Sequence, residues 1–395
     1  MNILIISPFY PWPLTSGGKI RVFNLIKYLS RQHQVTLACL TEAPVADAGP
    51  LPALCREVVT VERPSAMIRD LAAFLSGSLP FNAQKYRSAG FRSALQRLLA
   101  RQAFDLVQLE FSFLWSYADI LPLEKLVLDA HNIEADIIRQ LRQESAGLRR
   151  ALYLLEEQKM RRLEERAWRD CRLSLAVSEQ ERQLIEAATG DRAKVTTIPN
   201  GVDLERFTFV SRRPVEAGVL LLAGLDYAPN LDSVRFFLEE IFPSLRQQLT
   251  TATVDLVGRE FWRLDEYLKQ TGVVRHENVP EVLPFFQQAA LLAVPLRHGA
   301  GTRIKILEAM ASGLPVVTTS KGCEGLEVAS GEHLLVADTP QAFAAACLQL
   351  LAEPRRAADI ACRARKLVEE RYSWELQGEH LANLYSELSA GANPL

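Results

Sequence analysis

The sequence lacks the cysteine pairing of a disulfide or zinc protein. Its six cysteines lie far apart without a C-x-x-C pair, which is typical of reduced thiols in a cytosolic protein. No apolar run approaches the roughly 18 residues of a membrane-spanning helix. The N-terminal MNILIISPFYPWP has no basic region and no small-residue cleavage site, so it predicts a first strand rather than a signal peptide. We expect a cytoplasmic protein that is not integral to a membrane.

The sequence also lacks a large excess of charge of either sign. Lysine and arginine number 45 against 47 aspartates and glutamates, a net charge of −2, and this balance argues against a nucleic-acid partner. The sequence has no H-E-x-x-H spacing and no suitably placed D-x-D pair, so neither motif indicates a metal site. The absence of a G-x-S-x-G elbow and of a Walker loop excludes hydrolases of that type and P-loop kinases. We therefore expect no metal and no cofactor.

The composition is typical of a globular protein. Its 395 residues, 48% of them apolar and 23% charged, suit two domains of roughly 150–200 residues each. Short apolar runs alternate with helix-length amphipathic segments, the pattern of parallel sheets covered by helices. The sequence thus predicts an α/β fold of two Rossmann-like, doubly wound domains facing each other across a cleft, where the carboxyl ends of strands bind ligands.

The domain junction is expected near Pro199–Asp203, a turn-rich segment that follows a strand-like run at 195–198. The first domain then covers residues 1–200 and the second 201–373. A last helix, 374–390, has no strand after it and is predicted to return to the first domain. The strands expected are 2–7, 34–40, 57–61, 104–109, 125–129, 172–177, 218–222, 253–257, 290–294, 315–319 and 333–336. The helices expected are 19–31, 90–101, 148–170, 178–188, 231–249, 282–289, 302–312, 340–351 and 355–371.

The most informative stretch, 295–317, predicts one strand–loop–helix–strand unit. Gly299 and Gly301 allow the backbone to approach a ligand closely. A helix starting at Thr302 presents free amides and a positive dipole end, which favour an anion such as a diphosphate. Arg303 and Lys305 add cations to the first turn, although solvated surface charge is an alternative explanation for them. Carboxylate oxygens of Glu308 in this helix are able to accept hydrogen bonds from ribose hydroxyls, with an i, i+3 ion pair to Lys305 as the alternative.

Candidate ligand-binding residues also occur in the first half. Gly17 and Gly18 stand between a strand and a helix, where glycine permits a ligand to approach, although tight turns use glycine too. Arg21 follows them, and surface charge explains it equally well. His131 and Asn132 come after a strand ending in Asp129 and offer neutral hydrogen bonds suited to sugar hydroxyls. The alternative is a loop histidine without a special role.

The segment Leu307–Val317, LEAMASGLPVV, resembles the donor-site signature of glycosyltransferase family 4, retaining enzymes of GT-B fold. Further segments resemble the same family, so the likeness spans nearly the whole chain. They are Ser7–Pro11 with Ser16–Gly18 and Arg21, Asp129–Asn132, Val177–Glu179, Ile198–Asp203 and Val279–Phe286.

The resemblance implies roles for individual residues. It implies that Glu308 binds the donor ribose, that the loop Gly299–Thr302 contacts the phosphates and sugar, and that His131 lies close to the donor sugar. Gly17 and Gly18 are expected to face the diphosphate or acceptor, and Asn132 and Arg21 to bind the acceptor.

The chain departs from the family pattern at two places. Ala300 stands where the family has a second glutamate that contacts the sugar. The segment Ala223–Asn230 lacks the family's arginine and lysine, and we expect Arg303 and Lys305 to neutralise the diphosphate instead.

The function implied is retaining, metal-independent transfer of a sugar from a nucleoside diphosphate sugar to a glycan or lipid-linked acceptor, in polysaccharide or cell-envelope glycan synthesis. A nucleotide-sugar epimerase or hydrolase and a non-catalytic nucleotide-sugar binding protein are the alternatives. The segment Met67–Arg101 mixes apolar residues with arginines and a single acid. It predicts either a peripheral contact with anionic lipid or a lipid-linked acceptor, or helices that face the core and expose a charged side.

Overall fold

The computed structural model describes the whole chain except residues 64, 212–217, 265–268, 300–302 and 391–395. The described chain forms two compact units. The first, here called the N unit, comprises residues 1–200 together with the C-terminal helix α15 (Trp374–Ser389). The second, the C unit, comprises residues 201–373. None of the described helices is long and apolar enough to cross a membrane.

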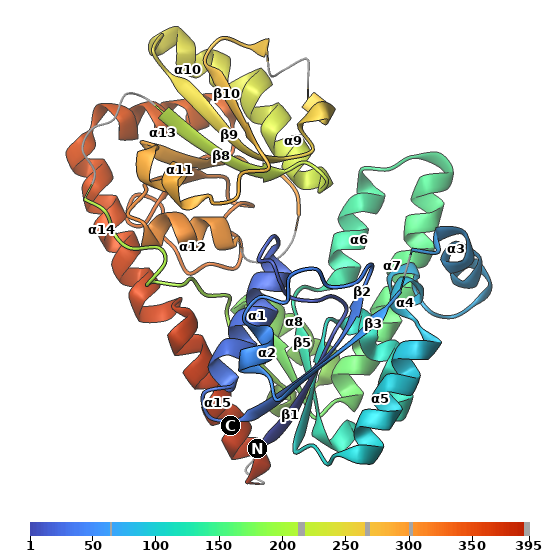
Figure 1. Ribbon diagram of the computed structural model, residues 1–395. Coiled ribbons are helices and arrows are strands. Elements are labelled where there is room, and N and C mark those ends of the chain that lie inside the picture. Colours follow the sequence, from blue (N-terminus) through green and yellow to red (C-terminus); the bar gives the residue numbers. More distant parts are fainter. Residues whose placement is uncertain (64, 212–217, 265–268, 300–302, 391–395) are drawn as a thin grey trace. The chain divides into compact units, whose positions relative to one another are not determined.

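A parallel sheet forms the centre of the N unit (Figure 1). Its described strands are ordered β3-β2-β1-β4-β5-β6-β7. They are β1 (Asn2–Ser7), β2 (Gln34–Thr41), β3 (Glu57–Glu62), β4 (Leu106–Glu110), β5 (Leu126–Ala130), β6 (Leu173–Ala176) and β7 (Val195–Thr197). Successive side chains of a strand point to opposite faces. Accordingly Ile3 and Ile5 of β1 belong to one core, and Leu4 and Ile6 belong to the other.

Helices cover both faces of this sheet. One core contains apolar residues of α1 and α15, and the other contains those of α5, α7 and α8. The helices are α1 (Gly17–Leu29), α2 (Leu51–Leu54), α3 (Met67–Ser76), α4 (Phe81–Tyr86), α5 (Ala89–Arg101), α6 (Glu134–Gln143), α7 (Gly147–Asp170) and α8 (Glu179–Thr189), with 3-10 turns at Ser112–Ile120, Leu123–Lys125 and Arg192–Lys194.

The C unit has a second parallel sheet, ordered β10-β9-β8-β11-β12-β13 among its described strands. By position in this unit the order is 3-2-1-4-5-6, that of dinucleotide-binding Rossmann domains. The strands are β8 (Gly218–Gly224), β9 (Thr253–Arg259), β10 (Val273–Glu277), β11 (Leu291–Val294), β12 (Val316–Thr318) and β13 (Leu335–Val336). The helices are α9 (Ala228–Phe236), α10 (Phe242–Gln248), α11 (Leu283–Gln288), α12 (Ile304–Ala311), α13 (Pro340–Ala352) and α14 (Pro354–Arg371), with a 3-10 turn at Phe261–Leu264.

Three details differ from the sequence-based expectations. The strand β10 was not predicted, nor were helices α2, α3, α4 and α6. The helix expected at 231–249 is divided by a π-helical segment, Phe237–Ile241, immediately before the helix α10 that contains Pro243. The helix expected from Thr302 begins at Ile304, with Arg303 at its N-cap position.

Candidate functional site

In an open α/β sheet, ligands bind at the carboxyl ends of strands where the strand order reverses. In the N unit this point lies between β1 and β4, and the neighbouring β5 follows β4. Glu110 is the last residue of β4, while Asp129 lies at the end of β5 and is followed closely by His131. All three side chains are buried. The fold thus gathers two carboxyl groups and an imidazole at one edge of the sheet.

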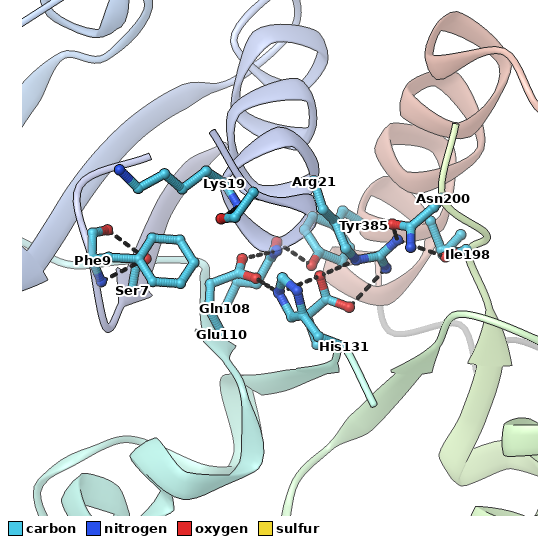
Figure 2. Close-up of polar contacts among 12 residues, drawn as sticks. Ser7, Phe9, Lys19, Arg21, Gln108, Glu110, His131, Ile198, Asn200 and Tyr385 are labelled. Atoms are coloured by element: carbon cyan, nitrogen blue, oxygen red, sulfur yellow. Dashed lines mark hydrogen bonds and ion pairs between the residues drawn. The ribbon is translucent and has the colours of Figure 1, made fainter. Parts of the chain in front are cut away.

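Arg21 of α1 belongs to this buried group (Figure 2). Its Nε and Nη2 donate to the two carboxylate oxygens of Asp129 at 2.8 and 2.7 Å. Its Nη1 donates to the carbonyl of Ile198 at 2.9 Å and to Oδ1 of Asn200 at 3.2 Å. With 1% of its surface exposed, Arg21 is not a solvated surface charge, and that explanation is wrong. Its expected contact with the acceptor stays a prediction, because all these bonds are internal.

Glu110 positions His131. Oε2 of Glu110 lies 2.6 Å from Nε2 of His131, and the ring of Phe111 stacks on the imidazole at a centroid distance of 3.7 Å. Phe111 has a positive φ of 67°, which is a strained backbone for a bulky residue and is typical of functional sites. The imidazole is therefore fixed both at its edge and on one face.

The hydrogen-bonded chain continues to the C-terminal helix. Gln108 of β4 donates from Nε2 to Oε1 of Glu110 at 2.6 Å, and its Oε1 accepts from the hydroxyl of Tyr385 at 2.6 Å. Both Gln108 and Tyr385 are fully buried. Helix α15 thus supports His131 through two intermediate side chains, as Figure 2 shows.

Replacing Tyr385 by phenylalanine is expected to lower the free energy of unfolding by about 1–2 kcal/mol, because Oε1 of Gln108 loses a buried donor. The matched control is Tyr153→Phe in α7, whose hydroxyl bonds Arg149 at the surface. Urea denaturation followed by tryptophan fluorescence measures both variants. Equal effects of the two substitutions would show that the bond to Gln108 contributes nothing particular.

Burial determines the protonation of this cluster. It lowers the pKa of His131 to about 4, so the imidazole is neutral at pH 7. Burial and the charge of Asp129 raise the pKa of Glu110 well above its ordinary value. Burial, the largest single influence, would raise the pKa of Asp129, but the charge and hydrogen bonds of Arg21 together with the contributions of His131 and Glu110 hold that pKa below its ordinary value. The cluster therefore presents a neutral imidazole beside a carboxylate that is already neutralised by Arg21.

Glu110, Asp129 and His131 also form a set whose potential ligand atoms lie within 4.8 Å of one another. Two carboxylates and an imidazole are suitable metal ligands. However, both oxygens of Asp129 accept hydrogen bonds from Arg21, whose positive charge opposes a cation at this place. The residues present therefore fit a metal ion poorly.

Asn132 and the first turn of α6 adjoin His131. The side chain of Asn132 hydrogen-bonds Glu134, whose pKa burial raises to about 7. Glu164 of α7 accepts the backbone N–H groups of Glu134 and Ala135 at 2.7 and 3.0 Å. These bonds connect the start of α6 to α7, so they fix the segment that carries His131 and Asn132.

The glycine pair begins α1. Ser16 is the N-cap, and its side chain accepts from the N–H of Lys19. A Cβ on Gly18 would lie 3.1 Å from ring atoms of both Phe9 and Phe111. Glycine at 18 thus lets α1 approach the ring that stacks on His131, while the expected contact of Gly17 and Gly18 with a ligand stays a prediction.

In the C unit the strand order reverses between β8 and β11. Gly299, in the loop after β11, has φ of 108°. A Cβ there would lie 2.9 Å from Nη2 of Arg303 and 3.1 Å from the hydroxyl of Tyr227. Glycine is therefore required where this loop meets the turn after β8. The next three predicted donor-binding residues, Ala300, Gly301 and Thr302, lie outside the described residues.

Two cations stand at the beginning of α12. Arg303 is the N-cap residue rather than part of the first turn; burial lowers its pKa, and it hydrogen-bonds Tyr227. Nζ of Lys305 donates to the carbonyl of Leu222 in β8 at 2.6 Å. Burial, and after it the charge of Arg303, lower the pKa of Lys305 to about 8. Lys305 of α12 thus contacts β8, the strand that leads into the segment Ala223–Asn230, where this sequence lacks the arginine and lysine of the family pattern.

Glu308 lies further along the same helix. Burial raises its pKa to about 7, although Arg206 and Lys305 oppose this effect. Within the described chain its carboxyl group makes no hydrogen bond and no ion pair with Lys305, which bonds Leu222 instead. The simple i, i+3 ion pair is therefore wrong for this structure, and the carboxyl group retains its capacity for hydrogen bonds.

Two family models match the chain. The model for "Glycosyltransferase Family 4" matches residues 15–206, and the model for "Glycosyl transferases group 1" matches residues 217–353. The chain belongs to this glycosyltransferase group.

Individual relatives resemble this glycosyltransferase to different extents. An uncharacterized 44.6 kDa protein from the cps region of Klebsiella pneumoniae is 21% identical over 389 residues, covering 94% of this chain and 96% of that protein. A GDP-mannose-dependent alpha-(1-6)-phosphatidylinositol monomannoside mannosyltransferase of Mycolicibacterium smegmatis is 29% identical over 239 residues. That match covers 53% of this chain and 61% of the mannosyltransferase, so the glycosyltransferase spans less than two thirds of the length of that relative.

Solved structures share its fold. A sucrose-phosphate synthase from Thermosynechococcus elongatus aligns with a TM-score of 0.74 and 17% identity over 99% of this chain and 100% of that chain. Anabaena HepE in complex with UDP and glucose aligns with a TM-score of 0.70 and 16% identity over 98% of this chain and 100% of that chain. The glycosyltransferase has the GT-B fold, with two parallel-sheet α/β domains.

The structure adds residues that the sequence motifs did not indicate. In the N unit of the glycosyltransferase, Glu110 contacts His131, Gln108 donates to Glu110, and Tyr385 of α15 donates to Gln108. In the C unit, Tyr227 hydrogen-bonds Arg303, and its hydroxyl lies where a Cβ on residue 299 would come within 3.1 Å of it. A glutamate and a glutamine inside the fully buried strand β4 were the available signal, because buried polar groups require partners.

Proposed function

We propose that this glycosyltransferase moves a sugar from a nucleoside diphosphate sugar to a glycan or lipid-linked acceptor, with retention of configuration and without a metal. The C unit binds the donor, and the N unit binds the acceptor. The product belongs to polysaccharide or cell-envelope glycan synthesis. The similar proteins named for GDP-mannose dependence and for a complex with UDP and glucose support a nucleoside diphosphate sugar as the donor class.

The observation that carries the proposal is the arrangement of charges on α12. Arg303 and Lys305 bring two cations to the N-terminal end of this helix, beside the carboxyl end of β8. Free amides and the dipole at a helix N-terminus favour a phosphate group. Glu308 follows with hydrogen-bonding capacity that suits ribose hydroxyls. All such donors contain a diphosphate followed by a ribose. The two cations of α12 suit the diphosphate, and Glu308, further along the helix, suits the ribose.

The chemistry assigned to these residues is positioning and charge stabilisation. Arg303 and Lys305 stabilise the diphosphate as the bond to the sugar breaks. In the N unit, neutral His131 hydrogen-bonds a sugar hydroxyl, and its fixed ring orientation limits the entropy lost on binding. In front-face transfer the departing phosphate accepts the proton of the acceptor hydroxyl, so the protein supplies no nucleophile.

The binding part of the proposal is tested with UDP, GDP, dTDP and ADP by thermal shift and calorimetry, since a bound ligand stabilises the native state. Arg303→Ala and Lys305→Met are each expected to weaken the nucleotide bound best by about 10- to 100-fold, the value of a charge-assisted hydrogen bond. Arg356→Ala, on α14 of the same unit, is the control for loss of a positive charge. Unchanged affinity in the Arg303 variant would remove this residue from the diphosphate site.

The transfer part is tested with labelled nucleotide sugars and a panel of glycan and lipid-linked acceptors, with and without EDTA. We expect a labelled acceptor in both conditions, because Arg21 opposes a cation at the Asp129 cluster. Product formed from the donor alone would indicate epimerisation or hydrolysis instead. Loss of transfer in EDTA that Mg²⁺ or Mn²⁺ restores would contradict metal independence.

A further inference from the structure

The carboxyl group of Glu110 lies fully buried among three polar side chains. Its Oε1 accepts from Nε2 of Gln108, and its Oε2 lies against Nε2 of His131, both at 2.6 Å (Figure 2). A further hydrogen bond joins it to the carboxyl group of Asp129. Because this carboxyl group has no exposed surface, its neighbours determine where each proton of the cluster lies.

Gln108 fixes one oxygen of Glu110 as an acceptor. The hydroxyl of Tyr385 donates to Oε1 of Gln108 at 2.6 Å, so the amide turns its N–H groups towards Glu110. All three side chains are buried, and the amide cannot turn round without leaving polar groups unpaired. A proton on Glu110 therefore belongs to Oε2 rather than to Oε1.

One proton is shared between the two carboxyl groups. Burial, followed by the charge of Asp129 and the hydrogen bond between the two groups, raises the pKa of Glu110 well above its ordinary value. Asp129 keeps its charge, since both of its oxygens accept from Arg21. Glu110 is thus the protonated partner, and its O–H is directed to the carboxylate of Asp129 rather than to His131.

The imidazole of His131 then has to supply the proton of its own contact with Glu110. In a neutral histidine, the hydrogen bond that the ring makes determines which nitrogen carries the proton. Nε2 lies 2.6 Å from Oε2 of Glu110 and 3.7 Å from Oδ2 of Asp129. Two carboxyl oxygens attract an N–H group and repel a lone pair. Nε2 therefore carries the proton, and the lone pair is on Nδ1.

This second nitrogen, Nδ1, makes no hydrogen bond to any residue that the structure describes. Phe111 stacks on the ring, and 5% of the His131 side chain is exposed. Nearly buried polar atoms normally have a partner. An acceptor without one, at the sheet edge where α/β folds bind ligands, is suited to a donor group of a ligand.

We propose that Glu110 is a positioning residue: it holds His131 as the Nε2–H tautomer, so that Nδ1 accepts a hydrogen bond from a hydroxyl group of the sugar. The inference rests on the proposed function for its ligand and adds the direction of the bond, in which the sugar donates and the imidazole accepts. The opposite tautomer would donate from Nδ1 and bind the oxygen of that hydroxyl. Glu110 acts through His131 and contacts no ligand itself.

The tautomer is measured at neutral pH in the full chain labelled with isotopic nitrogen in its histidines, by long-range proton–nitrogen correlation spectra without nucleotide sugar. Nε2 is recognised because it couples to both carbon-bound ring protons, and its chemical shift shows whether it is protonated. His131→Asn assigns the signal among the six histidines. We expect a protonated Nε2 in the wild-type chain. A protonated Nδ1 there would overturn the proposal, whatever the variants show.

Glu110→Gln is expected to reverse the tautomer. Because Gln108 needs an oxygen as its acceptor, the introduced amide turns its N–H groups towards Nε2 of His131, which then accepts, and Nδ1 becomes the protonated nitrogen. The control is Glu124→Gln, which removes an exposed carboxyl group of the same unit and should leave the His131 signal unchanged. An unchanged tautomer in folded Glu110→Gln would overturn the positioning role. The wild-type spectrum decides the tautomer even if this variant does not fold.

Calorimetry tests the direction of the bond to the sugar. The ligands are nucleotide sugars in which one hydroxyl at a time is replaced by hydrogen or by fluorine, which accepts a hydrogen bond but cannot donate one. At the hydroxyl bound by His131, both replacements are expected to raise Kd about tenfold, the value of one hydrogen bond. In His131→Ala these losses should disappear.

Two binding results would overturn the proposal. One is affinity that fluorine retains and hydrogen loses, which would make His131 the donor. The other is a set of losses that are the same in the wild-type chain and in His131→Ala, which would remove the sugar from Nδ1. Because the spectra contain no nucleotide sugar, a wrong tautomer leaves the proposed transfer reaction unaffected, and failure of transfer leaves the measured tautomer unaffected.

Discussion

Replacing Arg21 by methionine is expected to lower the free energy of unfolding of the N unit by about 3–5 kcal/mol. The variant leaves the carboxylate of Asp129 buried without its partner, and it removes donors from the carbonyl of Ile198 and from Asn200. Urea denaturation measures the change. Tryptophan fluorescence reports mainly on this unit, because four of the five tryptophans lie in it: Trp12, Trp115, Trp168 and Trp374.

A surface ion pair supplies the control. Arg101 pairs with Glu57 in the same unit, with 61% and 34% of the two side chains exposed, so Arg101→Met is expected to cost less than about 1 kcal/mol. The double variant Arg21→Met with Asp129→Asn is expected to recover part of the loss, because the buried charge disappears with its partner. Similar costs for Arg21→Met and Arg101→Met would mean that burial adds nothing to the Arg21 pair.

The same pair gives a pH dependence of known sign. Arg21 holds the pKa of Asp129 below its ordinary value in the folded chain. Asp129 therefore binds a proton at higher pH in the unfolded chain than in the folded chain. The contribution of the Arg21–Asp129 pair to stability is fully present above the ordinary aspartate pKa. It is lost as the pH falls through the lower, folded-state pKa. Arg21→Met should remove this component of acid unfolding.

Most of the fold was predictable from the sequence because the central strands of both sheets are buried on both faces. A run such as Asn2–Ser7 is almost entirely apolar, and the structure has β1 at those residues. The strand β10 was missed because it lies at the edge of its sheet and is largely exposed, with the sequence VVRHE. A half-polar edge strand lacks the apolar pattern on which the prediction depends.

The N-unit cluster was predictable only in part. The motif around Asp129 and His131 marked its position, but the partners Gln108 and Tyr385 are 277 residues apart in the chain. No local pattern relates residues at that separation. Arg21 was a candidate, but the sequence could not decide between a site residue and a surface charge for a different reason: α1 carries lysine and arginine among its apolar residues, and such a pattern also fits a solvated face. Only the buried carboxylate of Asp129 distinguishes the two situations.

His131→Ala is expected to lower kcat/KM for sugar transfer by about 10²–10³-fold, the usual effect of removing one fixed hydrogen-bonding group from a transition state. The structural reason is the orientation of the ring, which Glu110 holds at Nε2 and Phe111 holds on its face. Steady-state kinetics with the best donor and acceptor measure the change. Calorimetry with the nucleoside diphosphate should show little change, because the residues proposed to bind it belong to the C unit.

Two further measurements separate this role from a merely structural one. With a pKa of about 4, His131 is neutral from pH 5 to 8, so its protonation should reduce activity only towards pH 4. His131→Asn retains a neutral hydrogen-bonding side chain and should recover part of the activity lost in His131→Ala. A kinetic pKa near 6.5 that disappears in His131→Asn would show instead that the imidazole changes charge during catalysis, and the neutral hydrogen bond assigned to it would then be wrong.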